Sequence, residues 1–218
     1  MKNLYIIILL LALNGCKKSD DGTVKATNVS TVIGANGKIW MDRNLGATQV
    51  ATSSTDAAAY GDYYQWGRGS DGHQKTTSAV TSTLSTTDQP FNGNFIVINN
   101  LLSNWRSPQN DNLWQGVNGV NNPCPSGFRL PTETEWNAEI ASWSSKHSAG
   151  AFASPLKLPM AGLRSYANDE FFWLKVIGYY WSSTVDGGFA KALFFSSGNS
   201  GVSGTYRATG ICVRCIKN

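Results

Sequence analysis

The sequence predicts an α+β domain built mostly from short antiparallel strands and loops, with one or two helices. The chain has 22 glycines in 218 residues and long stretches rich in Ser, Thr and Asn, a composition typical of turn-rich folds with little helix. Asn36-Gly37 lies between alternating apolar residues, which is the strongest short-range signal for a β-hairpin. Thr132 and Glu135 have the spacing of a helix capping box, which predicts a helix after them.

The N-terminal residues predict a secretory leader. Lys2 precedes an apolar run, residues 4–13, that is too short to span a hydrocarbon core of ~30 Å. Asn14-Gly15-Cys16 follows and resembles the site at which bacterial lipoproteins are cleaved and acylated. Residues 1–15 are therefore expected to be a lipoprotein signal peptide, and Cys16 is expected to carry the lipid that attaches the protein to a membrane. An ordinary signal peptide followed by a chance cysteine is the alternative.

Residues 16–28 are polar and are expected to form a flexible tether. The KKSDDG stretch within them is similar to the acidic tags that send some lipoproteins of Gram-negative bacteria to the outer face of the outer membrane. An outer membrane lipoprotein exposed at the cell surface is therefore expected. The remainder, residues 29–218, suits one compact domain, since the chain is 41% hydrophobic and long enough to bury a substantial core.

Local patterns predict the elements of the first half of the domain. The hairpin around Asn36-Gly37 opens it. Residues 56–72 carry aromatic residues too crowded for one helical face, which predicts a short helix or turn that runs into a strand. Residues 75–88 are rich in Ser and Thr without periodicity, which predicts a long loop. Further on, residues 94–99 predict a short strand, and residues 104–116 predict a loop held by its two tryptophans.

One helix is well marked, at residues 133–144. The capping box precedes it, and Trp136, Ile140 and Trp143 recur at helical spacing. Downstream of this helix, turn residues separate short apolar stretches, as is typical of strands. These stretches are residues 156–165, 178–184, 189–196 and 206–218.

The cysteines of the domain predict one disulfide. Cys212 and Cys215 lie three positions apart, a spacing that on an extended strand separates them by ~10 Å, beyond the ~7 Å that a bridge can close. Cys215 lies on the apolar face of that strand, whereas Cys212 shares its face with Arg214. A bridge is therefore expected between Cys124 and Cys215. Cys212 is expected to be a free thiol that is exposed or half exposed.

Several short stretches together resemble one family. They are GKIWMDRNLGA, YGDYYQWGR, NPCPSGFRLPTETEW, LPMAGLRS, GYYWSST and the terminal VRC. This set resembles the Fibrobacter succinogenes major paralogous domain, a lipoprotein-borne domain with a C-type-lectin-like fold. FRLPTETEW is also similar to the RLPTEAEW element of formylglycine-generating enzymes, which share that fold. The resemblance covers residues 30–218 and implies a C-type-lectin-like fold here.

Among these domains, the chain most resembles those diversified by retroelements, in which adenines of the C-terminal coding region are randomised. In them, constant stretches such as GYYWSST and VRC alternate with positions that differ between gene copies. On this chain the variable positions would fall in residues 166–177, 186–194 and 199–212, and Cys212 would be a product of random codon change. The resemblance implies a variable ligand-binding face made by Tyr166, Asn168, Glu170, Phe171, Phe172, Trp173, Lys175, Phe189, Lys191, Phe194, Asn199, Thr205, Tyr206 and Thr209.

Residues 171–177 allow two interpretations. They are aromatic and aliphatic without a strand or helix period, so a buried strand is one, and an exposed recognition patch, which the resemblance favours, is the other. Asp169 and Glu170 lack the sugar motif of calcium-dependent lectins, so solvated carboxylates and no metal are expected. His73 and His147 are isolated in sequence and are expected at the surface. Seven tryptophans are expected to hold the core and its loops, namely Trp40, Trp66, Trp105, Trp114, Trp136, Trp143 and Trp181.

These patterns favour recognition without catalysis or a cofactor. The net charge is only +4 and the basic residues are scattered, so no nucleic-acid partner is expected. The expected protein is a surface lipoprotein whose variable face binds a protein or glycan outside the cell. One alternative is an adhesin or structural envelope protein with a fixed glycan- or protein-binding face. Another is a thiol enzyme related to the formylglycine-generating enzymes, although its two C-terminal cysteines would be spaced differently here and Cys215 is expected to be bridged.

Overall fold

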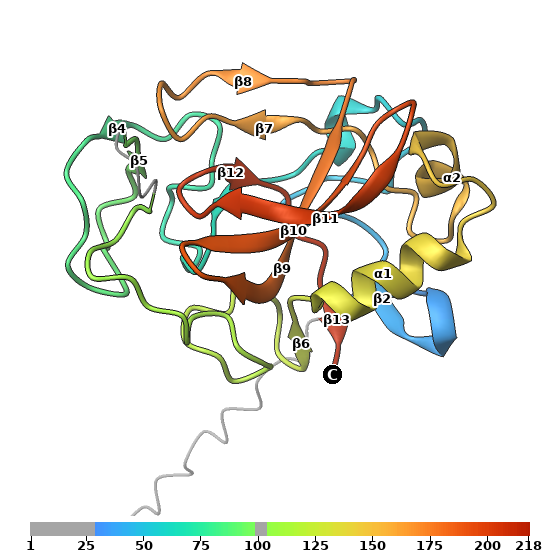
Figure 1. The fold of residues 1–218 in the computed structure, drawn as a ribbon, viewed down its shortest axis with the longest axis horizontal. Coiled ribbons are helices and arrows are strands. Elements are labelled where there is room, and N and C mark those ends of the chain that lie inside the picture. Colours follow the sequence, from blue (N-terminus) through green and yellow to red (C-terminus); the bar gives the residue numbers. More distant parts are fainter. Residues whose placement is uncertain (1–28, 99–103) are drawn as a thin grey trace, which may run out of the picture.

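A computed structural model describes residues 29–98 and 104–218 (Figure 1). The expected signal peptide, the lipidation site at Cys16 and the tether lie outside the described residues. Among the helices of the described part, none is long and apolar enough to cross a membrane.

The described chain is an assembly of short strands with two α-helices, which confirms the α+β prediction. Its sheets have the strand orders β1-β2-β13-β6, β11-β10-β9, β3-β12-β7-β8 and β4-β5. The β4–β5 pair is parallel and the other strand pairs are antiparallel. The strands are β1 (Thr31–Ile33), β2 (Ile39–Met41), β3 (Tyr64–Gln65), β4 (Val80–Thr81), β5 (Phe95–Ile96), β6 (Phe128–Arg129), β7 (Leu163–Arg164), β8 (Phe171–Phe172), β9 (Gly178–Asp186), β10 (Phe189–Phe195), β11 (Ser200–Tyr206), β12 (Gly210–Ile211) and β13 (Ile216–Lys217). The helices are α1 (Glu133–Ser142) and α2 (Ser148–Ala153), with 3₁₀ turns at Ala35–Gly37 and Ala57–Ala59.

The predicted N-terminal hairpin is confirmed, and it meets the C-terminal strand. β1 and β2 pair with Val32 opposite Trp40, and the turn between them places Asn36 and Gly37 at positive φ. Asn and Gly adopt that left-handed conformation most easily, which explains why this dipeptide specifies the turn. β13 then pairs with β2 and β6, so the two ends of the domain lie in one sheet.

Helix α1 begins where the capping box predicts. The Thr132 hydroxyl accepts a hydrogen bond from the Glu135 N–H, and the Glu135 carboxylate accepts one from the Thr132 N–H. The helix ends at Ser142, close to the predicted end, and buries Trp136 against β9 through an indole hydrogen bond to the Trp181 carbonyl. The second helix, α2, is six residues long, so it was too short for a helical period to reveal.

Tryptophans form the centre of the domain, as predicted. The seven expected core tryptophans are at most 4% exposed. Five of their indoles donate hydrogen bonds to backbone carbonyls in the core: Trp66 to Ser182, Trp105 to Trp66, Trp114 to Asn121, Trp136 to Trp181 and Trp181 to Tyr64. The two tryptophans of residues 104–116 therefore hold that loop in place. The eighth, Trp173, is 49% exposed.

The C-terminal segment passes through the middle of the domain. The Cys124–Cys215 disulfide is present, with Cα atoms 5.9 Å apart. The prediction of an exposed Cys212 is wrong, because Cys212 is fully buried and its thiol donates to the Tyr60 carbonyl. Alternation failed as a guide here because β12 is only two residues long and is covered on both faces. Arg214, expected to face solvent with Cys212, is buried as well.

β4 lies in residues 75–88, which were predicted to be a loop, and two further strands that the sequence did not favour border the site described below. β8 lies within residues 171–177, where no strand period is visible, and β11 contains two glycines and two serines. β8 is the outer strand of its sheet and β11 is the outer strand of the three-stranded sheet. In Figure 1, β8 and β7 run above the three-stranded sheet.

Candidate functional site

The three segments expected to vary converge on one cleft. It has a volume of about 610 Å³ and lies among β7, β8, β9, β10 and β11. Each variable segment contributes to its wall, and seven of the predicted face residues line it: Tyr166, Phe172, Trp173, Phe189, Thr205, Tyr206 and Thr209. The remaining lining residues, which the sequence analysis missed, are Leu163, Ser165, Tyr179 and Gly204.

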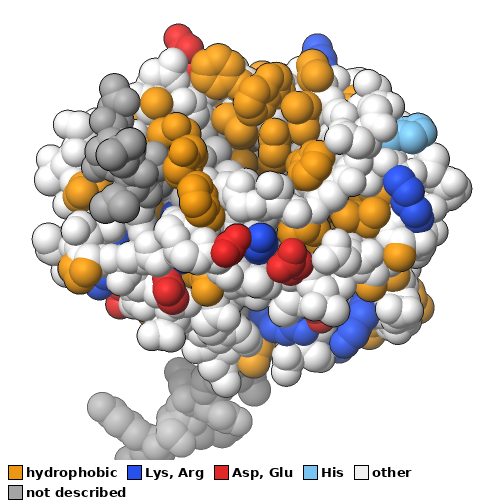
Figure 2. All heavy atoms as spheres, in the orientation of Figure 1, with side chains coloured by type: hydrophobic (Ala, Val, Ile, Leu, Met, Phe, Trp, Pro, Cys, Tyr) orange, Lys and Arg blue, Asp and Glu red, His pale blue; other side chains and the backbone are white. Residues whose placement is uncertain are grey.

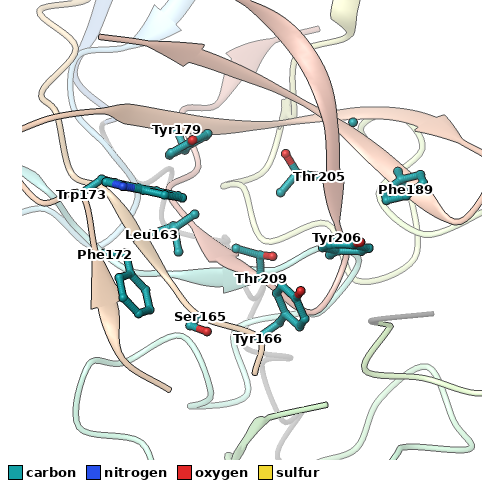
Figure 3. Close-up of a pocket in the computed structure, with 11 residues that line it drawn as sticks. Leu163, Ser165, Tyr166, Phe172, Trp173, Tyr179, Phe189, Thr205, Tyr206 and Thr209 are labelled. Atoms are coloured by element: carbon teal, nitrogen blue, oxygen red, sulfur yellow. The ribbon is translucent and has the colours of Figure 1, made fainter. Parts of the chain in front are cut away.

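Two groups of aromatic rings face each other across the cleft (Figure 3). On one side, the Trp173 ring lies 6.2 Å from Phe172 and 6.0 Å from Tyr179, measured between ring centroids. On the other side, Tyr206 lies 4.8 Å from Tyr166 and 5.1 Å from Phe189. These spacings are those of packed aromatic pairs, so each wall is a continuous aromatic surface.

The lining carries hydroxyl groups but no charge. Leu163 and Thr209 lie between the two walls, and Ser165 and Thr205 add further hydroxyls (Figure 3). The cleft therefore offers large apolar surfaces with hydroxyls that can both donate and accept hydrogen bonds. A concave, mostly apolar site of this size with a few polar groups is typical of ligand-binding sites, and a lining without charged side chains suits an uncharged ligand.

One wall of the cleft belongs to a ridge, residues 171–176, that projects apolar side chains into solvent. Trp173 is 49% exposed and Val176 is 55% exposed. Hydrogen bonds from Lys175 N to Met160 O and from Val176 N to Trp173 O tie the ridge down. This arrangement holds Trp173 and Lys175 at φ of 56° and 66°, a conformation that costs a non-glycine residue about 1 kcal/mol or more.

The exposure of the ridge bears on the two interpretations of residues 171–177. The expectation of an exposed patch agrees with Phe172, Trp173, Leu174 and Val176, each at least 39% exposed. Phe171 differs, because it is half buried and packs edge-to-face on Tyr63 at 5.0 Å. Figure 2 shows hydrophobic side chains gathered in the upper part of the face, where Figure 1 places β7 and β8.

Seven predicted face residues lie outside the cleft. Phe194 lines a smaller neighbouring pocket of about 250 Å³ that shares Tyr179 and Thr205 with the cleft. Lys191 pairs with Asp186 at 2.8 Å. The others, which the structure does not bring into the cleft, are Asn168 and Glu170 in the turn before β8, Phe171 and Lys175 on the ridge, and Asn199 in the turn before β11.

The two acidic residues before β8 differ from each other. Glu170 is exposed, as expected of a solvated carboxylate. Asp169 is not free in solvent, because it pairs with the Nε of Arg164, whose side chain is 1% exposed. Arg164 also donates to the Lys75 carbonyl and lies over the Phe95 ring, so the pair fastens β7 to the preceding loops. Within the described residues, no group of three or more His, Cys, Asp or Glu side chains is placed to hold a metal ion.

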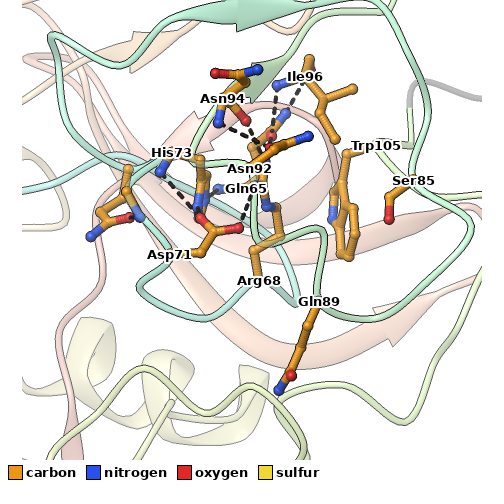
Figure 4. A network of polar contacts seen from close by, with 12 residues as sticks. Gln65, Arg68, Asp71, His73, Ser85, Gln89, Asn92, Asn94, Ile96 and Trp105 are labelled. Atoms are coloured by element: carbon orange, nitrogen blue, oxygen red, sulfur yellow. Dashed lines mark hydrogen bonds and ion pairs between the residues drawn. The ribbon is translucent and has the colours of Figure 1, made fainter.

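The prediction that His73 lies at the surface is wrong. His73 is fully buried, and its Nε2 accepts a hydrogen bond from the Gln65 N–H (Figure 4). The proton must therefore sit on Nδ1, which donates to Asp71 at 2.6 Å. Although an Asp–His pair can act in general-base catalysis, this one has no free nitrogen, and it joins Arg68 in a structural network. His147 is half buried and caps α2.

Acidification from pH 6.5 to 4 is expected to destabilise the fold through His73. Burial lowers the pKa of His73 from 6.5 to about 4, and Arg68 and Arg164 also disfavour its protonation, although Asp71 favours it. Between these pH values the unfolded chain binds a proton that the folded chain does not. The stability is therefore fully present above pH 6.5 and falls as the pH approaches 4, by at most about 3 kcal/mol.

The measurement is the free energy of unfolding in urea at a series of pH values. His73→Gln is the matched variant, because glutamine can accept from Gln65 and donate to Asp71 without titrating. Its stability should change much less over this pH range. Equal pH dependence in the two proteins would contradict the assignment.

Cys212, the free cysteine of the described residues, has the properties of a packing residue. Burial raises the pKa of Cys212 to about 12, while Arg214 acts in the opposite direction. A thiol with that pKa carries almost no thiolate at neutral pH, and the thiolate is the nucleophilic form.

Comparisons of the chain with protein-family models, with curated proteins and with solved structures find no match.

Proposed function

We propose that this protein is a lipoprotein displayed at the surface of the outer membrane, whose C-terminal part forms a variable ligand-binding face on a rigid C-type-lectin-like scaffold. The ligand is a protein or glycan outside the cell, and binding involves no catalysis. The observation that carries the proposal is the convergence of three separate segments, residues 166–177, 186–194 and 199–212, on a single aromatic cleft.

The exposed aromatic side chains support a recognition role. Monomeric soluble proteins rarely leave large apolar side chains clustered at the surface unless the cluster binds something. Here Phe172, Trp173 and Phe189 are each at least 39% exposed around the cleft. Since the backbone hydrogen bonds of the ridge fix its conformation, little conformational entropy would be lost when a ligand binds.

The frame behind the cleft supports the division into fixed and variable parts. Within the same three segments, Ala190, Leu193, Arg207 and Ile211 are buried. The disulfide and the C-terminal segment that passes through the middle of the domain hold those buried positions in place. Residues that line the cleft can therefore change while the buried core is preserved. The buried position of Cys212 removes it from the variable set, and its raised pKa argues against the thiol-enzyme alternative.

Sequencing many copies of the gene from one bacterial population tests the variable face. Codons for cleft residues such as Tyr166, Trp173 and Thr205 should differ among copies, whereas those for Arg207 and Cys212 should be uniform, because changes there would disrupt the core. Uniform codons throughout residues 166–212 would contradict diversification. A reverse transcriptase gene and an adenine-bearing template copy beside this gene would support it.

Ligand binding by the cleft is tested with Thr205→Arg, which would place a long charged side chain in an uncharged site. The wild-type protein should bind ligands selected from glycan arrays or displayed peptide libraries, and the variant should bind them at least tenfold more weakly. Thr77→Arg, at an exposed position away from the cleft, is the control. Equal binding by all three proteins would contradict the proposal. Binding of one sugar class by every natural copy would instead favour the fixed-face adhesin.

A further inference from the structure

The ridge separates the cleft from a second groove that the variable segments do not explain. Adjacent side chains of a strand point to opposite faces, and β8 follows this rule. Phe172 lines the cleft, whereas Phe171 lines a groove of about 470 Å³ on the other side. Trp173 and Leu174 divide in the same way, so the ridge presents aromatic or aliphatic surface to both sides.

Most of the second groove comes from the first half of the domain. Its far wall includes Thr48, Ala57, Ala58 and Thr76, and Tyr60 and Tyr63 also line it. Except for Phe171 and Leu174, none of its lining residues lies in a segment expected to vary. The wall opposite the ridge is therefore fixed, whereas the ridge wall of the same groove belongs to the variable segment 166–177.

No charged side chain lines the second groove. Two carboxylates beside it are already matched within the protein, whereas Lys175 on the ridge is exposed. Asp62 pairs with Lys75 at 2.9 Å, and Asp56 accepts hydrogen bonds from Gln49 and Thr52. Burying an unpaired charge against this surface would be costly, whereas an apolar side chain would gain from the aromatic and methyl groups exposed there.

We infer that the second groove is a subsite of the same binding face with one constant wall, and that one polypeptide ligand crosses the ridge with an uncharged apolar side chain on each side. The inference rests on the proposed function. Leu174, which lines the second groove, is 41% exposed and offers no hydrogen bonds to sugar hydroxyls, but its burial against an aliphatic or aromatic side chain of a protein would be favourable. The constant wall of the second groove would contribute binding affinity in every gene copy, and the cleft residues would determine which ligand binds.

The geometry fits a short extended segment. The ridge consists of one strand and the loop that follows it. A peptide of twelve extended residues reaches ~40 Å, which is more than it needs to place one side chain on each side of the ridge. Since β8 is the outer strand of its sheet, an extended segment can also approach its backbone.

The test uses a random dodecapeptide library displayed on phage and selected against the full chain. Selected peptides are synthesised, and their dissociation constants are measured for the wild type, Ala58→Arg, Thr205→Arg and Thr77→Arg. Ala58 is exposed in the second groove and Thr205 lines the cleft, so each arginine blocks one site at a position that tolerates a larger side chain. Peptides with two apolar residues should lose at least tenfold in affinity with either blocking variant and keep their affinity for Thr77→Arg.

The outcomes separate this inference from the proposed function. Peptides that are sensitive to Thr205→Arg but not to Ala58→Arg would overturn the second subsite and leave the cleft as the binding site. Peptides that are sensitive to neither would overturn both proposals. Failure to select any peptide, together with glycan-array binding that Ala58→Arg leaves intact, would overturn the polypeptide ligand.

Discussion

Cys124→Ala is expected to lower the free energy of unfolding by about 4 kcal/mol. The bridge joins residues 91 positions apart, so its loss gives the unfolded chain many more conformations. Cys124 precedes β6 and α1, and Cys215 lies between β12 and β13, so the bridge connects the helix end of the domain to the central C-terminal segment. Equilibrium unfolding in guanidinium, followed by the fluorescence of the buried tryptophans, measures the change.

Reduction supplies the control for this experiment. Dithiothreitol should destabilise the wild type to a similar extent and should leave Cys124→Ala unchanged. Cys212→Ala should keep its response to the reductant, because that cysteine is not bridged. The architecture would be contradicted if dithiothreitol left the stability of the wild type unchanged, or if a peptide map lacked the Cys124–Cys215 link. The segments that form the cleft would then not be held by a disulfide.

The sequence could predict those elements that a few neighbouring residues determine. Asn36-Gly37 determines its turn through backbone conformation, and Thr132 with Glu135 determines the start of α1 through two hydrogen bonds. The disulfide was predicted because extended geometry excludes a Cys212–Cys215 bridge and alternation placed Cys215 on the apolar face of its strand, although Cys212 is buried as well. For the turn and for the start of the helix, the physical cause lies within the segment itself.

Burial of the central segment could not be predicted in this way. Alternation assigns one strand face to solvent, but Cys212 is covered by Tyr60 and Tyr180 from segments far away in the sequence. His73 lies in a polar stretch, yet Asp71 and Gln65 satisfy both of its nitrogens, so the stretch can be buried. Long-range packing therefore overrode local pattern at both positions.

The candidate site was predicted only in part, because residues far apart in the sequence form it. The resemblance indicated the three segments, and seven of their residues line the cleft. Tyr179 was missed because it lies in a stretch assigned to the scaffold, although its alternation with the buried Tyr180 could have placed it on the other face of β9. The second groove could not be foreseen, because its two walls are more than ninety positions apart in sequence.

Arg214→Met is expected to lower the free energy of unfolding by about 3–5 kcal/mol, because buried acceptors lose their donor at roughly 1–3 kcal/mol each. Arg214 is 1% exposed, and its Nη1 donates to the Leu156 carbonyl at 2.7 Å while its Nε and Nη2 donate to the Asn44 side chain at 3.0 and 2.9 Å. Burial lowers its pKa to about 10, so it stays charged at neutral pH. Methionine fills the space of the stem but donates nothing, which leaves these acceptors buried without their donor.

Arg43→Met is the matched control, because Arg43 makes a partly exposed ion pair with Asp42 in the same region. It should cost less than about 1 kcal/mol, since pairs near solvent contribute little.

A double-mutant cycle with Asn44→Ala then isolates the Arg214–Asn44 interaction, which should amount to about 1–3 kcal/mol of coupling. If urea unfolding gives similar small losses for Arg214→Met and Arg43→Met, the guanidinium does not hold these segments together. If the losses differ as expected, a single buried cation joins the N-terminal hairpin, the chain before β7 and the C-terminal segment into the frame behind the cleft.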